Sequence, residues 1–356
     1  MKIGIITFHN GSNYGAALQT LALQEAIKKR NQKVQVINYK NRFIMQGLDK
    51  IRFKWSIRGV YFLLTDICNY RVNKKKISRF REFFKRYECT KLLNKQELKQ
   101  EDLDFDVIVS GSDQIWNPLL NSGYDDIYFG CICNAKKKVS YGSSIGNYRL
   151  NDEKLNEELR KLLLDYDCIS VRENAQDISK VIGREVVDVC DPTILLDKNE
   201  WKELLELRKK DDKYLLVYCL SDFTRVIEYA KKVAEEKKLS VYYIGDAFKK
   251  VKDVCYIRDI GPREFVELFY NASYIVTNSF HGTAFAVNFE KQFVSLRHPK
   301  SPERAVAFLE RVDLKERLVE NGQLLADMRT EDNKRGLDGL KKMRNDGYEY
   351  LKAIID

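Results

Sequence analysis

The chain has 356 residues, of which 44% are hydrophobic and 12% aromatic, and this composition supplies enough apolar surface for two buried cores. No apolar run approaches the roughly 18 residues that a membrane-spanning helix needs, and polar residues interrupt the first apolar run too early for a signal peptide. The eight cysteines are scattered and only Cys131 and Cys133 lie close together, which is typical of reduced thiols and completes no zinc site. We therefore expect a cytoplasmic protein.

The net charge of +10 comes from one segment. Residues 40–91 contain 15 Lys and Arg against 4 Asp and Glu, a net charge of +11, and the rest of the chain is close to neutral. The aromatic residues of this segment include Trp55, Tyr61, Phe62, Phe80, Phe83, Phe84 and Tyr87. Apolar residues recur at helical spacing from Ile77 onward, which predicts an amphipathic basic helix from Lys74 to Arg86.

Three roles for this basic segment remain open. It can be the solvated face of a helical insertion. It can also contact anionic lipid headgroups, or an acceptor carried on a lipid pyrophosphate, at the inner face of the membrane. A nucleic-acid surface is the least favoured of the three, because no RNA- or DNA-binding signature surrounds the patch, and we expect no nucleic-acid partner.

Strands and helices alternate along the first part of the chain. The expected elements are a strand at 3–8, a helix at 16–29, a strand at 34–39, a basic helical insert at about 40–100, strands at 107–110 and 138–142, a helix at 152–165, a strand at 168–172, a helix at 174–182 and a strand at 186–190. The alternation pauses near Asp191-Pro192. A first domain is therefore predicted at residues 1–197.

A second α/β series follows a charged stretch. The expected elements are a strand at 214–220, a helix at 224–237, strands at 240–244 and 254–257, a helix at 262–271, a strand at 274–278, a helix at 283–289, a strand at 293–296 and a helix at 302–311. A second domain is predicted at residues 198–330. The final segment, 331–356, is predicted to be a helix at 335–354 that packs back on the first domain.

Alternation of this kind predicts parallel sheets with helices on both faces. The predicted fold class is α/β, with two Rossmann-like domains facing a cleft and a basic helical insert in the first. Parallel sheets bind their ligands at the carboxyl ends of the strands. Candidate site residues are therefore sought in the turns that follow the strands.

Three such turns combine a buried strand, small residues and a helix start. They lie at residues 9–15, 110–118 and 277–283. A strand that opens into a helix leaves free backbone N–H groups and the positive end of the helix dipole at the turn, where an anion binds favourably. The third turn also contains His281 beside Gly282, and imidazole can gain or lose a proton near neutral pH.

Short motifs occur in a fixed order along most of the chain. They are Ile6-Thr7-Phe8, Asn13-Tyr14-Gly15-Ala16, Leu18-Gln19, Gly111-Ser112-Asp113-Gln114, Trp116-Asn117, Tyr141-Gly142-Ser143-Ser144-Ile145-Gly146, Ser170-Val171-Arg172-Glu173, Asp191-Pro192-Thr193 and Ser279-Phe280-His281-Gly282-Thr283. In this order they resemble the polysaccharide pyruvyl transferase family. The resemblance implies a fold similar to that of GT-B glycosyltransferases. It also implies transfer of pyruvate from phosphoenolpyruvate to a sugar as a ketal, with release of phosphate.

One residue departs from the family pattern. Some members have an arginine two residues before the motif histidine, where this chain has Ser279. An anion contact that an arginine makes there must come from elsewhere in this chain, or the donor differs.

Three residues are predicted to be catalytic. His281 suits general acid–base chemistry, Arg172 leaves the end of an apolar strand and can bind an anion with its planar fork, and Asp113 can orient the histidine or accept a proton from a sugar hydroxyl. Two structural alternatives stay open: Arg172 can instead form a salt bridge with Glu173 or another acid, and Asp113 can simply cap its turn.

A larger set is predicted to bind substrate. It consists of Asn13, Gly15, Gly111, Ser112, Gln114, Trp116, Arg149, Asn278, Ser279, Gly282, Thr283 and Arg297. No metal site is predicted, because the Asp-x-Asp pair at 104–106 enters a strand and no histidine lies near it. No cofactor is expected besides phosphoenolpyruvate as co-substrate, and the acceptor is expected to be a sugar, carried on a lipid.

Two other functions remain open. The first is a glycosyltransferase that uses a nucleotide-sugar in the same two-domain arrangement. The second is a non-catalytic protein whose basic insert binds an anionic glycan or a partner. A Ser–His–Asp hydrolase is disfavoured, because the chain has no Gly-x-Ser-x-Gly turn.

Overall fold

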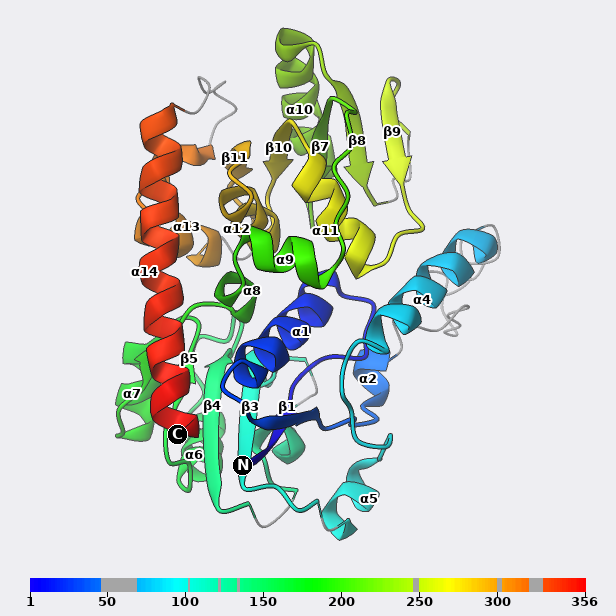
Figure 1. Ribbon diagram of the computed structural model, residues 1–356. Coiled ribbons are helices and arrows are strands. Elements are labelled where there is room, and N and C mark those ends of the chain that lie inside the picture. The colour runs from blue at the N-terminus through cyan, green and yellow to red at the C-terminus, as the bar shows by residue number, and fades with distance from the viewer. Residues whose placement is uncertain are drawn as a thin grey trace. The chain divides into compact units, whose positions relative to one another are not determined.

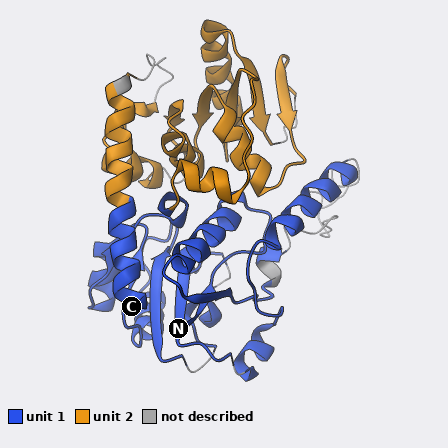
Figure 2. Ribbon diagram, in the orientation of Figure 1, with its two compact units in different colours: residues 1–195, 344–356 blue, residues 196–343 orange. Residues whose placement is uncertain are grey.

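The computed structural model describes residues 1–45, 69–101, 103–120, 123–132, 135–245, 250–299, 303–319 and 329–356. Trp55, Tyr61, Phe62 and Cys133, which the sequence analysis singled out, lie outside these residues. The chain divides into two compact units (Figure 2). Unit 1 contains residues 1–195 and 344–356, and unit 2 contains residues 196–343.

Unit 1 is built on a six-stranded sheet in the order β2-β1-β3-β4-β5-β6 (Figure 1). The strands are β1 (Lys2–Ile6), β2 (Lys33–Val36), β3 (Val107–Asp113), β4 (Lys137–Ser143), β5 (Ser170–Val171) and β6 (Val187–Asp188). All neighbouring pairs are parallel. The carboxyl ends of these strands therefore lie along one edge of the sheet.

The helices of unit 1 connect these strands. They are α1 (Tyr14–Lys28), α2 (Arg42–Met45), α4 (Tyr70–Phe84), α5 (Lys95–Gln100), α6 (Glu153–Leu163), α7 (Ala175–Ile182) and α8 (Pro192–Leu195), with a 3-10 turn at Asp126–Phe129. Helix α1 begins after Asn13, whose side chain accepts a hydrogen bond from the Ala16 amide. The Gln19 side chain, fully buried on α1, donates to the Phe8 and Ala16 carbonyls.

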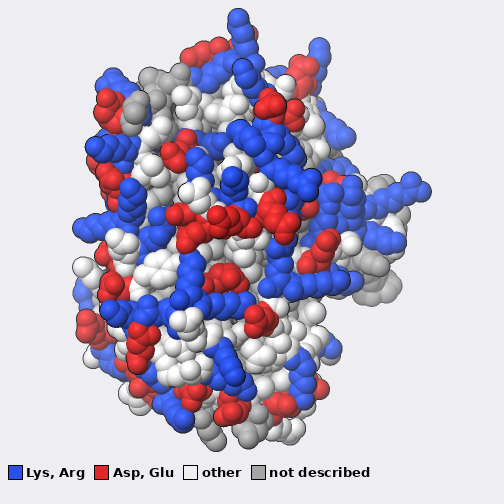
Figure 3. All heavy atoms as spheres, viewed as in Figure 1, with Lys and Arg blue, Asp and Glu red and all other residues white. Residues whose placement is uncertain are grey.

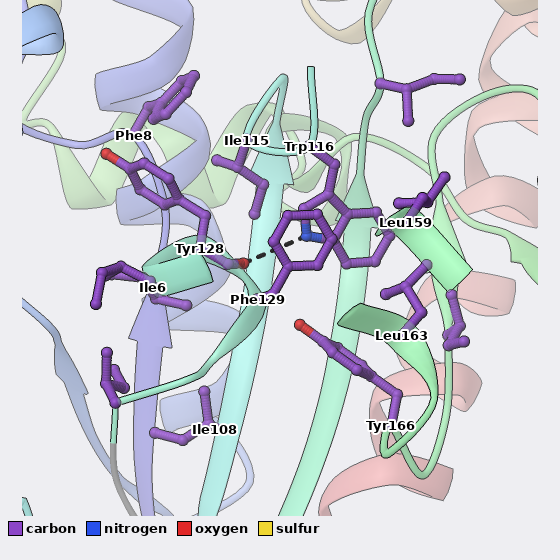
Figure 4. Close-up of a cluster of buried hydrophobic side chains, with 14 of the residues drawn as sticks. Ile6, Phe8, Ile108, Ile115, Trp116, Tyr128, Phe129, Leu159, Leu163 and Tyr166 are labelled. Carbon is purple, nitrogen blue, oxygen red and sulfur yellow. Dashed lines mark hydrogen bonds between the residues drawn. The ribbon is translucent and has the colours of Figure 1, made fainter. Parts of the chain in front are cut away.

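The core of unit 1 is rich in aromatic residues (Figure 4). Trp116 is fully buried, and its indole N–H donates to the Tyr128 carbonyl at 3.3 Å. The Phe129 ring stacks on Trp116 with a centroid distance of 5.3 Å, and Tyr166 meets the indole edge-on. This packing fixes the segment that follows β3, and with it the turn that contains Asp113.

Unit 2 is built on a second six-stranded parallel sheet, in the order β12-β11-β10-β7-β8-β9. Its strands are β7 (Tyr214–Tyr218), β8 (Ser240–Ile244), β9 (Val254–Ile257), β10 (Tyr274–Thr277), β11 (Gln292–Leu296) and β12 (Leu318–Val319). Its helices are α9 (Lys198–Leu204), α10 (Phe223–Lys237), α11 (Pro262–Asn271), α12 (Phe280–Asn288) and α13 (Glu303–Arg311), with a 3-10 turn at Lys315–Arg317. The predicted α/β class, with two parallel-sheet units, is confirmed.

The last helix, α14 (Thr330–Ile355), begins in unit 2 and ends in unit 1. Within unit 1, the Arg344 side chain donates from Nε to the Ile194 carbonyl at 2.9 Å. Gly347 is required by close packing, since a Cβ there would lie 2.6 Å from the Tyr141 hydroxyl and 2.9 Å from Leu195. The end of the chain is thereby bound to α8 and β4.

Some element ends differ from the sequence prediction by a few residues. The helix predicted at 283–289 begins at Phe280, because Ser279 serves as its N-cap. The basic helix predicted from Lys74 to Arg86 runs from Tyr70 to Phe84. The short helices α8 and α9 and the two-residue strand β12 were not predicted, because segments this short contain too few residues for periodicity to show. Across the described part of the chain, no helix is long and apolar enough to cross a bilayer.

Candidate functional site

In unit 1, the motif segments meet at the carboxyl edge of the sheet. The Thr7 hydroxyl donates to the Ser112 carbonyl at 2.8 Å, which joins the segment after β1 to the end of β3. The Ser144 amide donates to the Asp113 carbonyl at 3.0 Å, and the Arg172 amide to the Ser143 carbonyl at 3.3 Å. Parallel pairing therefore gathers residues from distant parts of the sequence at one place.

Arg172 lies at this edge among three carboxylates. Its side chain is 3% exposed, and its Nη1 donates to Asp191 Oδ2 at 2.6 Å. Asp113 Oδ1 lies 3.6 Å from Nη2, and Glu173 Oε2 lies 3.8 Å from Nε. Burial alone would lower the pKa of Arg172, but the nearby carboxylates outweigh burial and raise it. The ion-pair alternative for Arg172 is thus present, and it involves three acids at once.

One edge of the Arg172 guanidinium has no hydrogen-bond partner among the described residues. Nε and Nη2 are both buried without one, as are Oε2 of Glu173 and Oγ of Ser112. Gly142 adopts a φ of +62°, and a Cβ there would lie 3.2 Å from Arg172 Cγ and 3.6 Å from Ser112 Oγ. Buried polar groups are normally hydrogen-bonded. These atoms are therefore suited to bind a polar group of a ligand.

Asp113 occupies the left-handed region with a φ of +71°. Its carboxylate accepts a hydrogen bond from the Gln114 amide at 2.8 Å, so the turn-capping role is present. Gln114 in turn accepts from Asn117 Nδ2 at 2.9 Å. Gly146, with a φ of +63°, packs so closely on this amide pair that a Cβ would clash with both side chains. The turn after β3 is therefore rigidly held.

The other residues predicted to bind substrate in unit 1 lie in different surroundings. Trp116 is fully buried in the core, so its side chain does not face a ligand in this structure. Gly111 lies under Leu23, whose Cδ2 would be 2.6 Å from a Cβ. Asn13 caps α1, and Gly15 is buried within it. Arg149 is exposed between β4 and α6, and Ser112 is fully buried beside Arg172.

In unit 2, the predicted residues other than Arg297 lie at the carboxyl end of β10, and Arg297 follows β11. Thr277 Oγ1 donates to the Tyr218 carbonyl at 2.6 Å. The Asn278 side chain accepts from the Leu220 amide at 2.9 Å and donates to the Ser221 carbonyl at 2.7 Å. The end of β10 is thereby bound to the segment that follows β7.

The start of α12 is held equally closely. The Ser279 hydroxyl caps the helix, and the Thr283 hydroxyl pairs with that of Ser295 at 3.0 Å. Gly282 packs on Thr277, and a Cβ at this position would clash with Thr277 Oγ1. This explains why a glycine follows the motif histidine: any side chain would displace the threonine that ties β10 to β7.

His281 lies in the first turn of α12 and is partly exposed. Its ring packs against Phe280 with a centroid distance of 5.3 Å and an interplanar angle of 76°. The residue thus lies at a helix N-terminus and is partly exposed as a whole, while its Nε2 atom is buried. This placement is compatible with proton transfer, which remains a prediction.

Sequence reasoning missed Arg225. This residue lies in the first turn of α10, which follows β7, and its Nη2 donates to the carbonyl of Arg297 at 2.9 Å. Its Nε lies 2.9 Å from Asp222 Oδ2. The same criterion that selected Arg172, an arginine soon after a strand, would have found it.

His9 is a structural residue of unit 1. It is 2% exposed, with Nδ1 3.0 Å from the Thr7 carbonyl and Nε2 3.1 Å from Asn38 Oδ1. Burial lowers the pKa of His9 below its usual 6.5, against the effect of these two contacts.

Over the described residues, no group of three or more His, Cys, Asp or Glu could hold a metal ion.

The basic helix α4 has one buried and one exposed face. Ile77, Phe80 and Phe83 are its buried residues. Lys76 Nζ lies 5.2 Å from the centre of the Tyr14 ring, a cation–π contact that joins α4 to α1. The exposed basic residues are Arg71, Lys74, Lys75, Arg81 and Lys85. Lys and Arg side chains gather over this helix in the space-filling view (Figure 3).

Comparison with known proteins gave one family match. The family model described as polysaccharide pyruvyl transferase matches residues 13–300. No curated protein matches the sequence significantly.

Several solved structures are similar in fold. UDP-GlcNAc 2-epimerase from Neisseria meningitidis, bound to UDP-GlcNAc, is 14% identical, with 99% of this chain and 94% of that chain covered and a TM-score of 0.47. The Methanocaldococcus jannaschii enzyme in complex with UDP-GlcNAc and UDP is 14% identical over 97% and 93%, with a TM-score of 0.42. The Escherichia coli heptosyltransferase WaaC with ADP is 8% identical over 88% and 99%, with a TM-score of 0.41.

Proposed function

The chain belongs to the polysaccharide pyruvyl transferase family, and we propose that it transfers pyruvate from phosphoenolpyruvate to a sugar carried on a lipid. One observation supports a ligand site most directly. In each unit, motif residues of the family follow the carboxyl ends of parallel strands, with Asp113 and Arg172 in unit 1 and His281 in unit 2. This edge is where parallel α/β sheets bind their ligands.

The proposed reaction sets clear chemical demands. The methylene carbon of phosphoenolpyruvate takes up a proton, two sugar oxygens bond to the adjacent carbon, and the bond between that carbon and the phosphate oxygen breaks. The two sugar hydroxyls lose one proton each. One of these two protons makes up for the proton added to the methylene carbon. The other leaves with the released phosphate. A site for this reaction needs a proton donor, a proton acceptor and groups that bind anions.

The candidate residues can meet these demands. His281 is proposed to donate the proton to the methylene carbon, and Asp113 to accept a proton from a sugar hydroxyl. Arg172 is held at one end by Asp191, and its buried Nε–Nη2 edge, 3.6 to 3.8 Å from Asp113 and Glu173 and without a hydrogen bond among the described residues, is proposed to bind a substrate oxygen. Backbone N–H groups at the start of α12 can bind an anion in addition.

A lipid-linked acceptor would place the reaction at a membrane surface. The exposed basic face of α4 supports such a contact, since cationic residues near a surface are attracted by anionic headgroups. We propose that the protein works in the cytoplasm and contacts the inner membrane face peripherally through α4. The plain alternative is that this face is only solvated.

The decisive experiment is an incubation of the full chain with phosphoenolpyruvate and a set of lipid-linked glycans. Phosphate release and the product mass are measured together. Release of phosphate with a matching gain of a pyruvate ketal on one glycan supports the proposal. Turnover of a nucleotide-sugar, with no phosphate from phosphoenolpyruvate, would instead identify a glycosyltransferase.

A further inference from the structure

We propose that Arg225 binds the phosphorylated end of the donor in unit 2, at the edge of the sheet from which His281 emerges, an inference that rests on the proposed function. Arg225 belongs to none of the family motifs found in the sequence. Its place in the sheet, its contacts and the charges around it together assign it to the site.

The first argument is its place in the sheet. Strand β10 lies between β11 and β7, and Thr277 is in register with both Ser295 and Tyr218. Arg225 follows β7, and its Nη2 donates at 2.9 Å to the carbonyl of Arg297, which follows β11. The side chain therefore links the two strands that flank β10, at the end from which Asn278 to His281 emerge.

The second argument is how the side chain is held. Asp222 has a φ of +56° just before α10, and its Oδ2 lies 2.9 Å from Nε of Arg225, three residues later. Asp222 and the Arg297 carbonyl thus fix the direction of the guanidinium from two sides. The Arg225 side chain is still 39% exposed, so a ligand can reach it. A pre-oriented fork loses little entropy when it binds phosphate.

The third argument is the surrounding chemistry. Ser279 caps α12 and carries no charge, so the turn itself offers backbone groups, hydroxyl groups and the His281 imidazole, but no lysine or arginine. Arg225 brings a guanidinium group to this edge, where it is in contact with the Asp222 carboxylate and with the carbonyl of Arg297. Around Arg172 in unit 1, by contrast, three carboxylates surround one guanidinium. These three acids repel a dianionic phosphate, which leaves Arg172 to bind another, less charged oxygen of the substrate.

The test is a calorimetric titration of the full chain with phosphoenolpyruvate and, separately, with inorganic phosphate. Arg225→Gln is expected to raise the Kd of both by about ten- to a hundredfold, the usual size of a charge-assisted contact. Arg225→Lys keeps the charge but not the fork, and is expected to recover only part of the affinity. Lys232→Gln removes one exposed cation further along the same helix and should bind like wild type.

Thermal unfolding of each variant shows whether it is folded, and a folded Arg225→Gln variant with a Kd within about twofold of wild type would overturn the inference. If Arg225→Gln fails to fold, Arg225→Lys is measured in its place, and a Kd within about twofold of wild type would again overturn the inference. A wild type that binds inorganic phosphate through Arg225 but not phosphoenolpyruvate would refute the proposed donor and leave the anion site intact. A wild type that binds neither would overturn the site itself.

Discussion

Nη1 of Arg172 lies 2.6 Å from Oδ2 of Asp191, and both side chains are almost completely buried, at 3% and 0% exposure. Asp191 also accepts hydrogen bonds from the amide of Thr193 at 2.9 Å and from its hydroxyl at 2.7 Å. The pair thus joins the exit of β5 to the start of α8. Because both partners are buried, removal of one leaves an uncompensated charge.

Asp191→Asn is expected to lower the free energy of unfolding by about 3 kcal/mol, the lower end for a broken buried pair, since Asp113 and Glu173 still partly balance Arg172. Chemical denaturation measures the loss. Asp177→Asn is the matched control, because Asp177 pairs with Lys180 at 3.7 Å on the exposed surface of α7 and should cost under about 0.5 kcal/mol. Equal effects in the two variants would contradict this role of Asp191.

Arg172→Lys separates charge from geometry at the same position. Lysine keeps the positive charge among the three carboxylates, so most of the stability should remain. It cannot offer the planar Nε–Nη2 edge, so the donor KM is expected to rise by about tenfold or more. Steady-state kinetics with varied phosphoenolpyruvate measures the change. An unchanged donor KM would remove Arg172 from the donor site and leave it a purely structural residue.

His281→Ala is expected to abolish transfer while the protein stays folded. The residue lies partly exposed in the first turn of α12, and its loss creates no core cavity. Loss of a general acid or base typically lowers kcat by about 10²–10⁴-fold. Thermal unfolding checks the fold, and single-turnover kinetics checks the chemical step. A variant that retains more than about a tenth of the wild-type kcat argues against proton transfer by His281.

Charge reversal on α4 tests the membrane contact. Arg71, Lys74 and Lys75 lie on its exposed face, and their joint replacement by glutamate should weaken binding to vesicles that contain anionic lipid. The effect should fade as salt is added. Activity on a short soluble acceptor should stay near wild type. Lys154, Lys161 and Lys180, exposed on α6 and α7, give a control triple with the same change in net charge. If both triples bind vesicles equally, α4 has no specific role.

The buried His9 should make stability depend on pH. Because burial lowers its pKa below 6.5 in the folded state, the unfolded state takes up a proton first as the pH falls. The free energy of unfolding is therefore expected to decrease as the pH falls from about 7 to 5.5. His9→Gln removes this proton uptake and should flatten the profile in that window. Denaturant titrations at several pH values measure the slopes, and parallel slopes would show that His9 does not contribute.

The sequence by itself determined the fold class and the family. Apolar periodicity predicted most strands and helices, and the strand at 254–257 and the helix at 262–271 end where predicted. Motif residues could be placed at strand exits, because turn chemistry and helix capping depend on only a few neighbouring residues. The family match over residues 13–300 confirms the resemblance found in the motifs.

Only the tertiary structure decided what these residues contact. Trp116 was predicted to bind substrate, yet it fills the core, because the packing around β3 directs it inward. Arg172 meets an acid 19 residues later in the chain, and Arg225 meets a carbonyl 72 residues away. Such contacts depend on strand order and on which strands flank one another. A local pattern contains no information about either, so the partners of a charged side chain become visible only when the sheet is assembled.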